Sequence, residues 1–157
     1  MRRVTIAVGV MASILATLNA SAGEVTAIEL HGQIQESPAP DPSCTGMRFQ
    51  SVGALDGAPT GAVDWTGGSC VDLIMQPGNV TVRDGSFSLA DGLLEGTYEA
   101  TGGPDATGHV VVTETFTLTG GNGVYEGATG SGTFTADVDL FTTIADVTLI
   151  GSLELAG

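Results

Sequence analysis

Alternation of apolar and polar residues is the dominant pattern along this chain, and it predicts β-strands. In residues 109–119, HVVVTETFTLT, one face of the expected strand carries Val110, Val112, Phe116 and Leu118, and the other carries threonines. After the first 22 residues, no segment shows the 3.6-residue period of an amphipathic helix. The pattern therefore predicts an all-β domain.

Turn signals separate the expected strands, among them the Asp-Gly pairs that begin at residues 56, 84 and 91. Two longer loops are expected, one over residues 36–44, which contain three prolines, and one over residues 56–69. In the second loop Trp65 is expected to cap a barrel mouth or to form part of a ligand lid. The predicted strands cover residues 24–35, 45–54, 70–75, 79–83, 86–90, 93–101, 109–119, 124–138 and 146–155.

Strands that are apolar on one side must cover that side, by closing into a barrel or by pairing two sheets. A single closed antiparallel barrel is the favoured solution, because closure also removes the open strand edges that invite aggregation. The same alternation predicts that Leu140 and Leu149 point inward at the end of the chain.

Glu114 interrupts the apolar row of residues 109–119, so its carboxyl is expected inside the barrel. A buried carboxyl has a raised pKa, as a general acid or a steering group does. A one-residue bulge that turns Glu114 outward, or a wet polar lumen, would remove that role. Tyr98 shares a face with Leu94 and Gly96, which predicts core packing or a hydroxyl in the lumen.

The first 22 residues have the features of a secretory signal peptide, with a basic start, a short apolar run and the small-residue triplet Ala20-Ser21-Ala22. The apolar run over residues 4–18 is shorter than the roughly 20 residues of a membrane-spanning helix. We therefore expect cleavage before Gly23, a single domain over residues 23–157, and a secreted protein that has no membrane contact after cleavage.

Charge narrows the classes of partner. Without Arg2 and Arg3, the 18 carboxylates face only Arg48 and Arg83, a formal charge of −16, and the chain has no lysine. Such a surface repels the phosphates of nucleic acids and anionic lipids, so neither is expected as a partner. Solubility outside the cell is the preferred explanation of the acidity.

The two cysteines, Cys44 and Cys70, are expected to form one disulfide in an oxidising compartment. A zinc site is not expected, because neither cysteine has a nearby C-x-x-C or H-x-x-x-H partner. His31 and His109 lie on the polar faces of their strands, without metal-ligand spacing. No metal and no cofactor are therefore predicted.

The glycine-rich residues 120–132, GGNGVYEGATGSG, could serve four purposes. A phosphate-binding loop needs a lysine and a following helix, and a repeated calcium site needs spaced aspartates, whereas this stretch has only Glu126. The flanking threonines suggest an ice-binding face, but the twist of a closed barrel would not keep them planar. The favoured purpose is structural, a turn with positive φ angles followed by a tight bend.

Residues 116–134, FTLTGGNGVYEGATGSGTF, resemble the G-G-T-G-x-[FY]-x-G-A-x-G-x-G pattern of the allene oxide cyclase barrel group, which includes plant dirigent proteins and bacterial secreted proteins. Asn122 stands where threonine is usual. With the preceding strand-turn-strand unit, the resemblance covers residues 85–135, about a third of the chain. It implies a calycin-type barrel of eight antiparallel strands with a hydrophobic lumen, and a homo-oligomer, since plant members are often trimeric.

Two hypotheses for function follow. The leading one is a secreted barrel that binds a small molecule or has a structural role, without a catalytic centre legible in the sequence. The alternative is a dirigent-like or cyclase-like enzyme that guides ring closure or coupling of an apolar small molecule, with Glu114 and Tyr98 in the lumen. Phe116, Phe134 and Leu149 are expected to face that lumen. A lumen that they fill favours the first hypothesis, and an open lumen that holds Glu114 favours the second.

Overall fold

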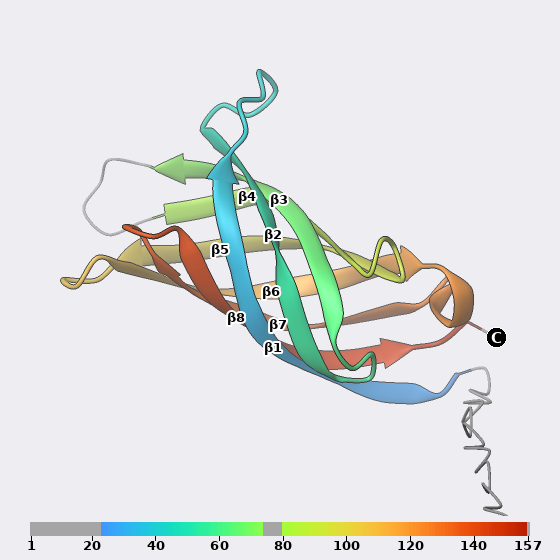
Figure 1. The fold of residues 1–157 in the computed structure, drawn as a ribbon. Helices are drawn as coiled ribbons and strands as arrows, with labels where there is room; N and C mark the ends of the chain where they lie inside the picture. Colours follow the sequence, from blue (N-terminus) through green and yellow to red (C-terminus); the bar gives the residue numbers. More distant parts are fainter. Residues whose placement is uncertain (1–22, 74–79, 157) are drawn as a thin grey trace, which may run out of the picture.

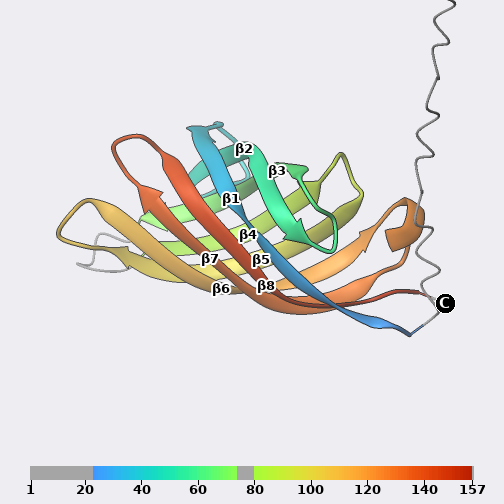
Figure 2. The same cartoon turned by 60° about the horizontal axis from the view of Figure 1, so that its bottom comes forward.

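The structure, a computed structural model, describes residues 23–73 and 80–156 and forms one closed barrel of eight antiparallel strands (Figures 1 and 2). Each strand pairs with its neighbours in the sequence, and β8 closes the ring against β1. The predicted closed barrel is confirmed, while the predicted leader and residues 74, 75 and 79 of two predicted strands lie outside the described residues. The elements are β1 (Val25–Pro38), β2 (Met47–Ala58), β3 (Val63–Leu73), β4 (Val80–Leu89), β5 (Leu94–Pro104), β6 (His109–Gly121), the short 3-10 helix η1 (Gly123–Tyr125), β7 (Thr129–Asp139) and β8 (Ile144–Glu154).

The predicted long loop over residues 56–69 is wrong, because most of it belongs to β2 and β3. Strand β2 continues through Asp56 and Gly57, and β3 begins at Val63. Trp65 lies in β3 opposite Gly53 of β2, with its side chain buried in the barrel. It is therefore a core residue and neither a cap nor a lid.

The two predicted strands over residues 79–83 and 86–90 form a single strand, β4, with a bulge in its middle. The pairing register with β5 shifts between Val82 and Gly85, and Asp84 has a φ of 51°. The bulge moves the inward positions from even to odd numbers, so that Val82 and Gly85 both face inward. A Cβ at Gly85 would lie 2.5 Å from the ring of Tyr98, so only glycine leaves room for that ring.

The glycine-rich stretch forms the connection between β6 and β7. Gly123 begins the 3-10 turn with a φ of 60°, and Tyr125 is buried beneath it. The structural purpose predicted for these glycines agrees with this geometry, although β7 starts at Thr129, later than predicted. Leu140 is 52% exposed, contrary to its predicted inward position, because β7 ends at Asp139.

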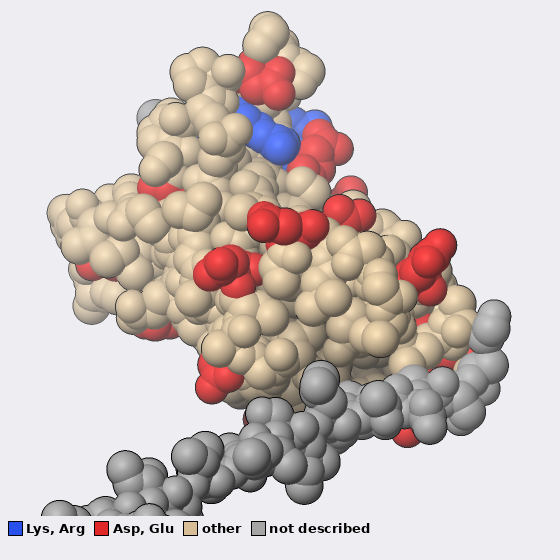
Figure 3. Space-filling view, turned by 45° about the vertical axis from the view of Figure 1, so that its right-hand side comes forward, with Lys and Arg blue, Asp and Glu red and all other residues tan. Residues whose placement is uncertain are grey.

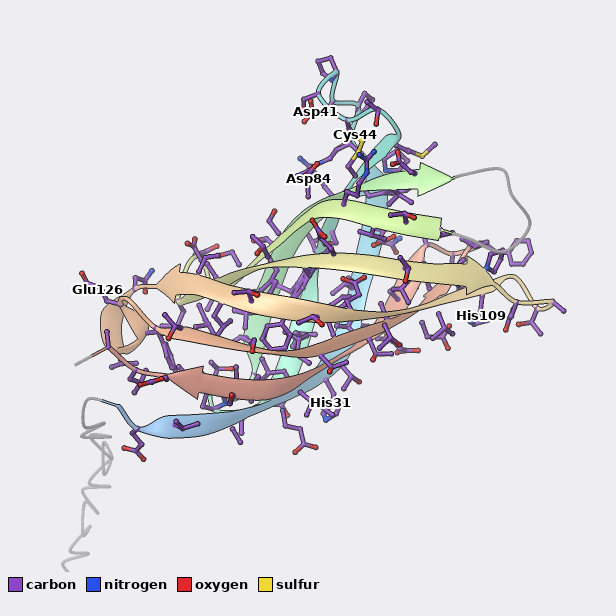
Figure 4. All side chains as sticks on the ribbon, turned by 180° about the vertical axis from the view of Figure 1, so that it is seen from behind. His31, Asp41, Cys44, Asp84, His109 and Glu126 are labelled. Atoms are coloured by element: carbon purple, nitrogen blue, oxygen red, sulfur yellow. A yellow bond between two sulfur atoms is a disulfide. The ribbon has the colours of Figure 1, made fainter. Side chains whose placement is uncertain are left out.

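The predicted disulfide between Cys44 and Cys70 is confirmed, with a Cα–Cα distance of 5.6 Å. It joins the loop that connects β1 and β2 to the outer side of β3, near one end of the barrel (Figures 1 and 4). Bridged thiols of this kind persist in oxidising compartments. In the described part of the chain, no helix has the length and apolar character that a bilayer crossing requires.

The core fills the barrel unevenly along its axis. An aromatic cluster of five side chains crosses the middle of the barrel: Trp65, Phe87, Tyr98, Phe116 and Phe134. Trp65 stacks on Phe87 with 5.1 Å between ring centroids, and Tyr98 stacks on Phe134 with 5.0 Å. Buried leucines pack the end of the barrel at which the ends of the described chain lie; they are Leu30, Leu55, Leu89, Leu94, Leu118, Leu149 and Leu153. The opposite end is less completely filled.

Candidate functional site

A cavity of about 210 Å³ occupies the less filled end of the barrel. Its inner wall is buried, and its rim includes the exposed Pro104 and Leu140, so it opens to solvent at that end. The wall is mostly aliphatic, which suits an apolar ligand, and a few polar groups converge on it. Its lining consists of Glu36, Phe49, Ser69, Val71, Val80, Val82, Tyr98, Pro104, Val110, Val112, Glu114, Phe134, Ala136, Val138 and Leu140.

Glu114 lies in this wall because the alternation of β6 continues without a bulge from Val110 to Leu118. Its side chain is only 5% exposed, and neither carboxyl oxygen has a hydrogen-bond partner among the described residues. Burial, together with the nearby charge of Glu36, raises the pKa of Glu114 to about 8. The group is therefore mainly a neutral carboxylic acid at pH 7, as the sequence predicted for a buried carboxyl.

The side chain of Glu36, near the C-terminal end of β1, brings a second carboxyl to the same cavity. It is half-buried, and burial raises its pKa. Glu36 was not predicted as a site residue, because the expected strand ended at Gln35. The alternation of inward and outward side chains could have revealed it, since Glu36 continues the inward row of Ile28, Leu30 and Ile34.

Tyr98 belongs to the aromatic cluster and also lines the cavity. Its ring stacks on Phe134, and burial followed by the charge of Glu114 raises the pKa of its hydroxyl, which is a neutral donor across the physiological range. Phe49 and Ser69 also line the cavity, and neither was among the residues predicted to form a site. Ser69 was missed because it fell in the segment expected to be a loop.

Of the three residues predicted to face the lumen, only Phe134 lines the cavity. Phe116 and Leu149 are buried in the filled part of the interior, where Phe116 meets Phe87 edge to face at 6.1 Å. The lumen is thus filled over part of its length and open around Glu114, so it has features of both hypotheses.

The basic residues of the described chain lie outside the cavity. Arg83 forms an ion pair with Asp72 and donates to the Thr45 hydroxyl at 2.9 Å, while Arg48 lies 3.5 Å from the Asp84 carbonyl oxygen. The basic side chains visible in Figure 3 gather beside the loop that carries the disulfide. Glu114 consequently has no cationic partner among the described residues that line its cavity.

The two histidines are on the outer surface, as the alternation predicted (Figure 4). His109 forms a 2.8 Å hydrogen bond with Asp137, which raises its pKa, and His31 lies 3.2 Å from the Thr148 hydroxyl. Within residues 23–73 and 80–156, no group of three or more side chains could hold a metal ion.

Two solved structures resemble this barrel over almost their whole length. The pterocarpan synthase dirigent protein GePTS1 superposes with a TM-score of 0.53 at 13% sequence identity, covering 96% of this chain and 100% of that chain. The pterocarpan synthase dirigent protein PsPTS1 gives a TM-score of 0.51 at 11% identity, covering 88% and 99%. No protein-family model matches the chain, and no curated protein matches its sequence. At these identities the likeness concerns the fold, and the chain has the eight-stranded barrel fold of dirigent-like proteins.

Proposed function

We propose that this protein is a secreted barrel that binds one small, mostly apolar molecule in the cavity beside Glu114. The observation that carries the proposal is the carboxyl of Glu114, which is buried in an apolar wall and finds no hydrogen-bond partner among the described residues. An unsatisfied buried polar group destabilises the fold, typically by about 1–3 kcal/mol. A ligand that hydrogen-bonds to this carboxyl would remove that cost and would give the position a purpose.

The size of the cavity sets the size of the ligand. A cavity of roughly 150 Å³ holds benzene, and pockets for drug-sized ligands start at roughly 300 Å³. At about 210 Å³, the cavity suits a single ring or a short branched chain with one polar substituent. This size disfavours a polycyclic ligand held entirely inside the barrel.

Secretion is part of the proposal and rests on two features. The first 22 residues have the composition of a signal peptide, and the disulfide requires an oxidising compartment to persist. The strongly acidic surface agrees with a partner that is neither nucleic acid nor anionic lipid.

A cavity-filling substitution tests the proposed binding. Ala136 is buried on the cavity wall, and Ala136→Leu should weaken the binding of 2-phenylethanol, a neutral single-ring probe, at least tenfold because the added carbons occupy the cavity. Isothermal titration calorimetry measures the affinity. The matched control is Thr135→Leu, on the outward side of the same strand, which should bind the probe as the unmodified protein does. Equal affinity for Ala136→Leu, or no saturable binding to the unmodified protein, would contradict the proposal.

A second candidate function is a cyclase-like activity, and the neutral carboxylic acid of Glu114 is the observation in its favour. A proton donor in an apolar, shaped cavity can act as a general acid. The cavity size favours ring closure within one small molecule over coupling of two ring-bearing molecules. The two similar structures, both named as pterocarpan synthase dirigent proteins, support an activity of this general kind.

Citronellal, a small unsaturated aldehyde, tests this candidate. Glu114 would protonate the aldehyde oxygen, the alkene would form the new carbon–carbon bond, and the resulting carbocation would return a proton to the carboxylate, giving the isomer isopulegol. Chiral gas chromatography should show an isomer ratio different from that in buffer, and Glu114→Gln should abolish the difference. If both proteins give the ratio found in buffer, Glu114 has no steering role toward this substrate.

A further inference from the structure

We propose that the preferred ligand of this cavity is a small organic cation, an amine with an apolar body and a single ammonium group. This inference rests on the proposed binding function and names the chemical class of the ligand. The proposed ligand is not purely apolar, because the polar side chains around the cavity include two carboxyls and no basic group among the described residues.

The charged groups around the cavity favour a cationic ligand. Two carboxyls, Glu36 from β1 and Glu114 from β6, face the same small space. No basic side chain is present among the described residues that line it, and both described arginines contact other groups on the outer face. If both were ionised, the two carboxylates in this apolar cavity would repel each other, and a ligand cation would offset that repulsion.

The hydrogen-bonding capacity of Glu114 also favours an ammonium group. Both carboxyl oxygens are buried and have no hydrogen-bond partner within residues 23–73 and 80–156, so the site offers strong acceptors to a ligand once the carboxyl is ionised. An ammonium group has three donors, enough to reach these oxygens and a neighbouring acceptor such as the Ser69 hydroxyl. Hydrogen bonds between charged partners are about twice as strong as neutral ones.

The aromatic side chains of the cavity also favour an ammonium group. Phe49, Tyr98 and Phe134 line the same cavity as the two carboxyls. Aromatic rings attract ammonium groups through their electron-rich faces, with a contribution of a useful size when the cation is desolvated. A ring on the ligand could also pack against the valines of the wall.

The field of the whole protein favours the same class of ligand. The chain carries 18 acidic residues and only four arginines, and carboxylates are spread over the face shown in Figure 3. Such a surface raises the local concentration of cations and speeds their association, an effect that salt screens.

Binding of an ammonium group should be linked to a proton. Among the described residues, the titratable groups facing the cavity are Glu36 on β1, Tyr98 on β5 and Glu114 on β6, while β2, β3, β4 and β7 contribute none. The pKa of Glu114, about 8, means that roughly nine molecules in ten are protonated there at pH 7. A bound cation stabilises the carboxylate, so that binding releases about one proton into solution.

The test compares two probes of nearly equal shape, 2-phenylethylamine and 2-phenylethanol, by isothermal titration calorimetry at pH 7. The amine should bind the full-length folded protein at least tenfold more tightly than the alcohol. Repeating the amine titration in phosphate and in Tris, which differ in their heat of ionisation, should show the release of about one proton per amine bound. The alcohol should show none.

Variants locate the effect. Glu114→Gln should bring the ratio of amine affinity to alcohol affinity close to one, and Glu36→Gln should lower that ratio several-fold. Glu99→Gln, an exposed carboxylate on the outer side of β5, is the matched control and should keep the ratio of the unmodified protein. A folded Glu36→Gln protein keeps the test decisive if Glu114→Gln does not fold.

Two negative outcomes have different meanings. If the alcohol binds as tightly as the amine and no proton is released, the cationic class is wrong while small-molecule binding stands. If neither probe binds in a saturable way that Ala136→Leu weakens, the proposed function fails, and this inference fails with it.

Discussion

Replacing Trp65 by alanine is expected to lower the free energy of unfolding by about 3–5 kcal/mol. The indole is 1% exposed and stacks on Phe87 and on Phe134, with ring centroids 5.1 and 5.9 Å away. Its N–H also donates to the buried Ser51 hydroxyl at 2.9 Å, and the substitution leaves that hydroxyl without a donor. A loss of this size is a large part of the roughly 5–15 kcal/mol that stabilises a typical domain.

Urea denaturation followed by far-ultraviolet circular dichroism measures this loss. Val52→Ala removes an exposed side chain from the outer face of the neighbouring strand and should change the stability by less than about 0.5 kcal/mol. A Trp65→Ala protein as stable as the Val52→Ala protein would show that the aromatic cluster does not hold the barrel together.

The second large effect is the pH dependence of stability that Glu114 imposes. Its pKa is about 8 in the folded protein against a usual value of 4.5, so the folded state binds the proton more tightly than the unfolded state. The stability that protonated Glu114 contributes is therefore fully present below about pH 4.5 and declines as the pH rises toward 8. At about 1.4 kcal/mol for each pH unit, the decline attributable to Glu114 totals roughly 5 kcal/mol.

Glu114→Gln should remove this decline. The difference in free energy of unfolding between Glu114→Gln and the unmodified protein should grow by about 1.4 kcal/mol per pH unit between pH 5 and 8 and then level off. Urea denaturation at four pH values gives the slope. For Thr115→Val, on the outer side of the same strand and without a titratable group, the difference should stay flat. A flat difference for Glu114→Gln would mean that this carboxyl is solvated in the folded protein.

The alternation of inward and outward side chains along each strand made much of the barrel predictable. Wherever alternation runs unbroken, as from Val110 to Leu118, the inward residues follow from the sequence, Glu114 included. The closure of the sheet into a barrel followed from the same alternation, because every strand has one apolar side to cover. The residues of the filled interior, such as Phe116, were predictable for the same reason.

The prediction failed where glycine or aspartate suggested a turn that the fold does not make. Gly67 and Gly68 pair with β2 inside a continuous strand, and pairing across the barrel, which is absent from local sequence, keeps them extended. Asp84-Gly85 is a bulge because its neighbours on both sides continue to pair with β5. A turn and a bulge use the same residue types, so only the partner strand distinguishes them.

The cavity itself was beyond sequence reasoning. Its size depends on how far the rings of Tyr98 and Phe134 extend along the barrel axis, and on small lining residues such as Ala136, two positions after Phe134 on β7. Its acidity depends on two carboxyls from strands that are distant in the sequence, Glu36 and Glu114. Such coincidences in space arise from register and shear, which no single strand encodes.

The ends of the described chain lie close together, since the amide of Gly23 donates to the carbonyl of Leu155 at 3.3 Å. Both emerge from the leucine-packed end, while the cavity opens at the other. An affinity handle or a carrier protein joined to either end would therefore leave the mouth unobstructed, and the barrel could be immobilised on a sensor surface in an orientation that still admits small molecules.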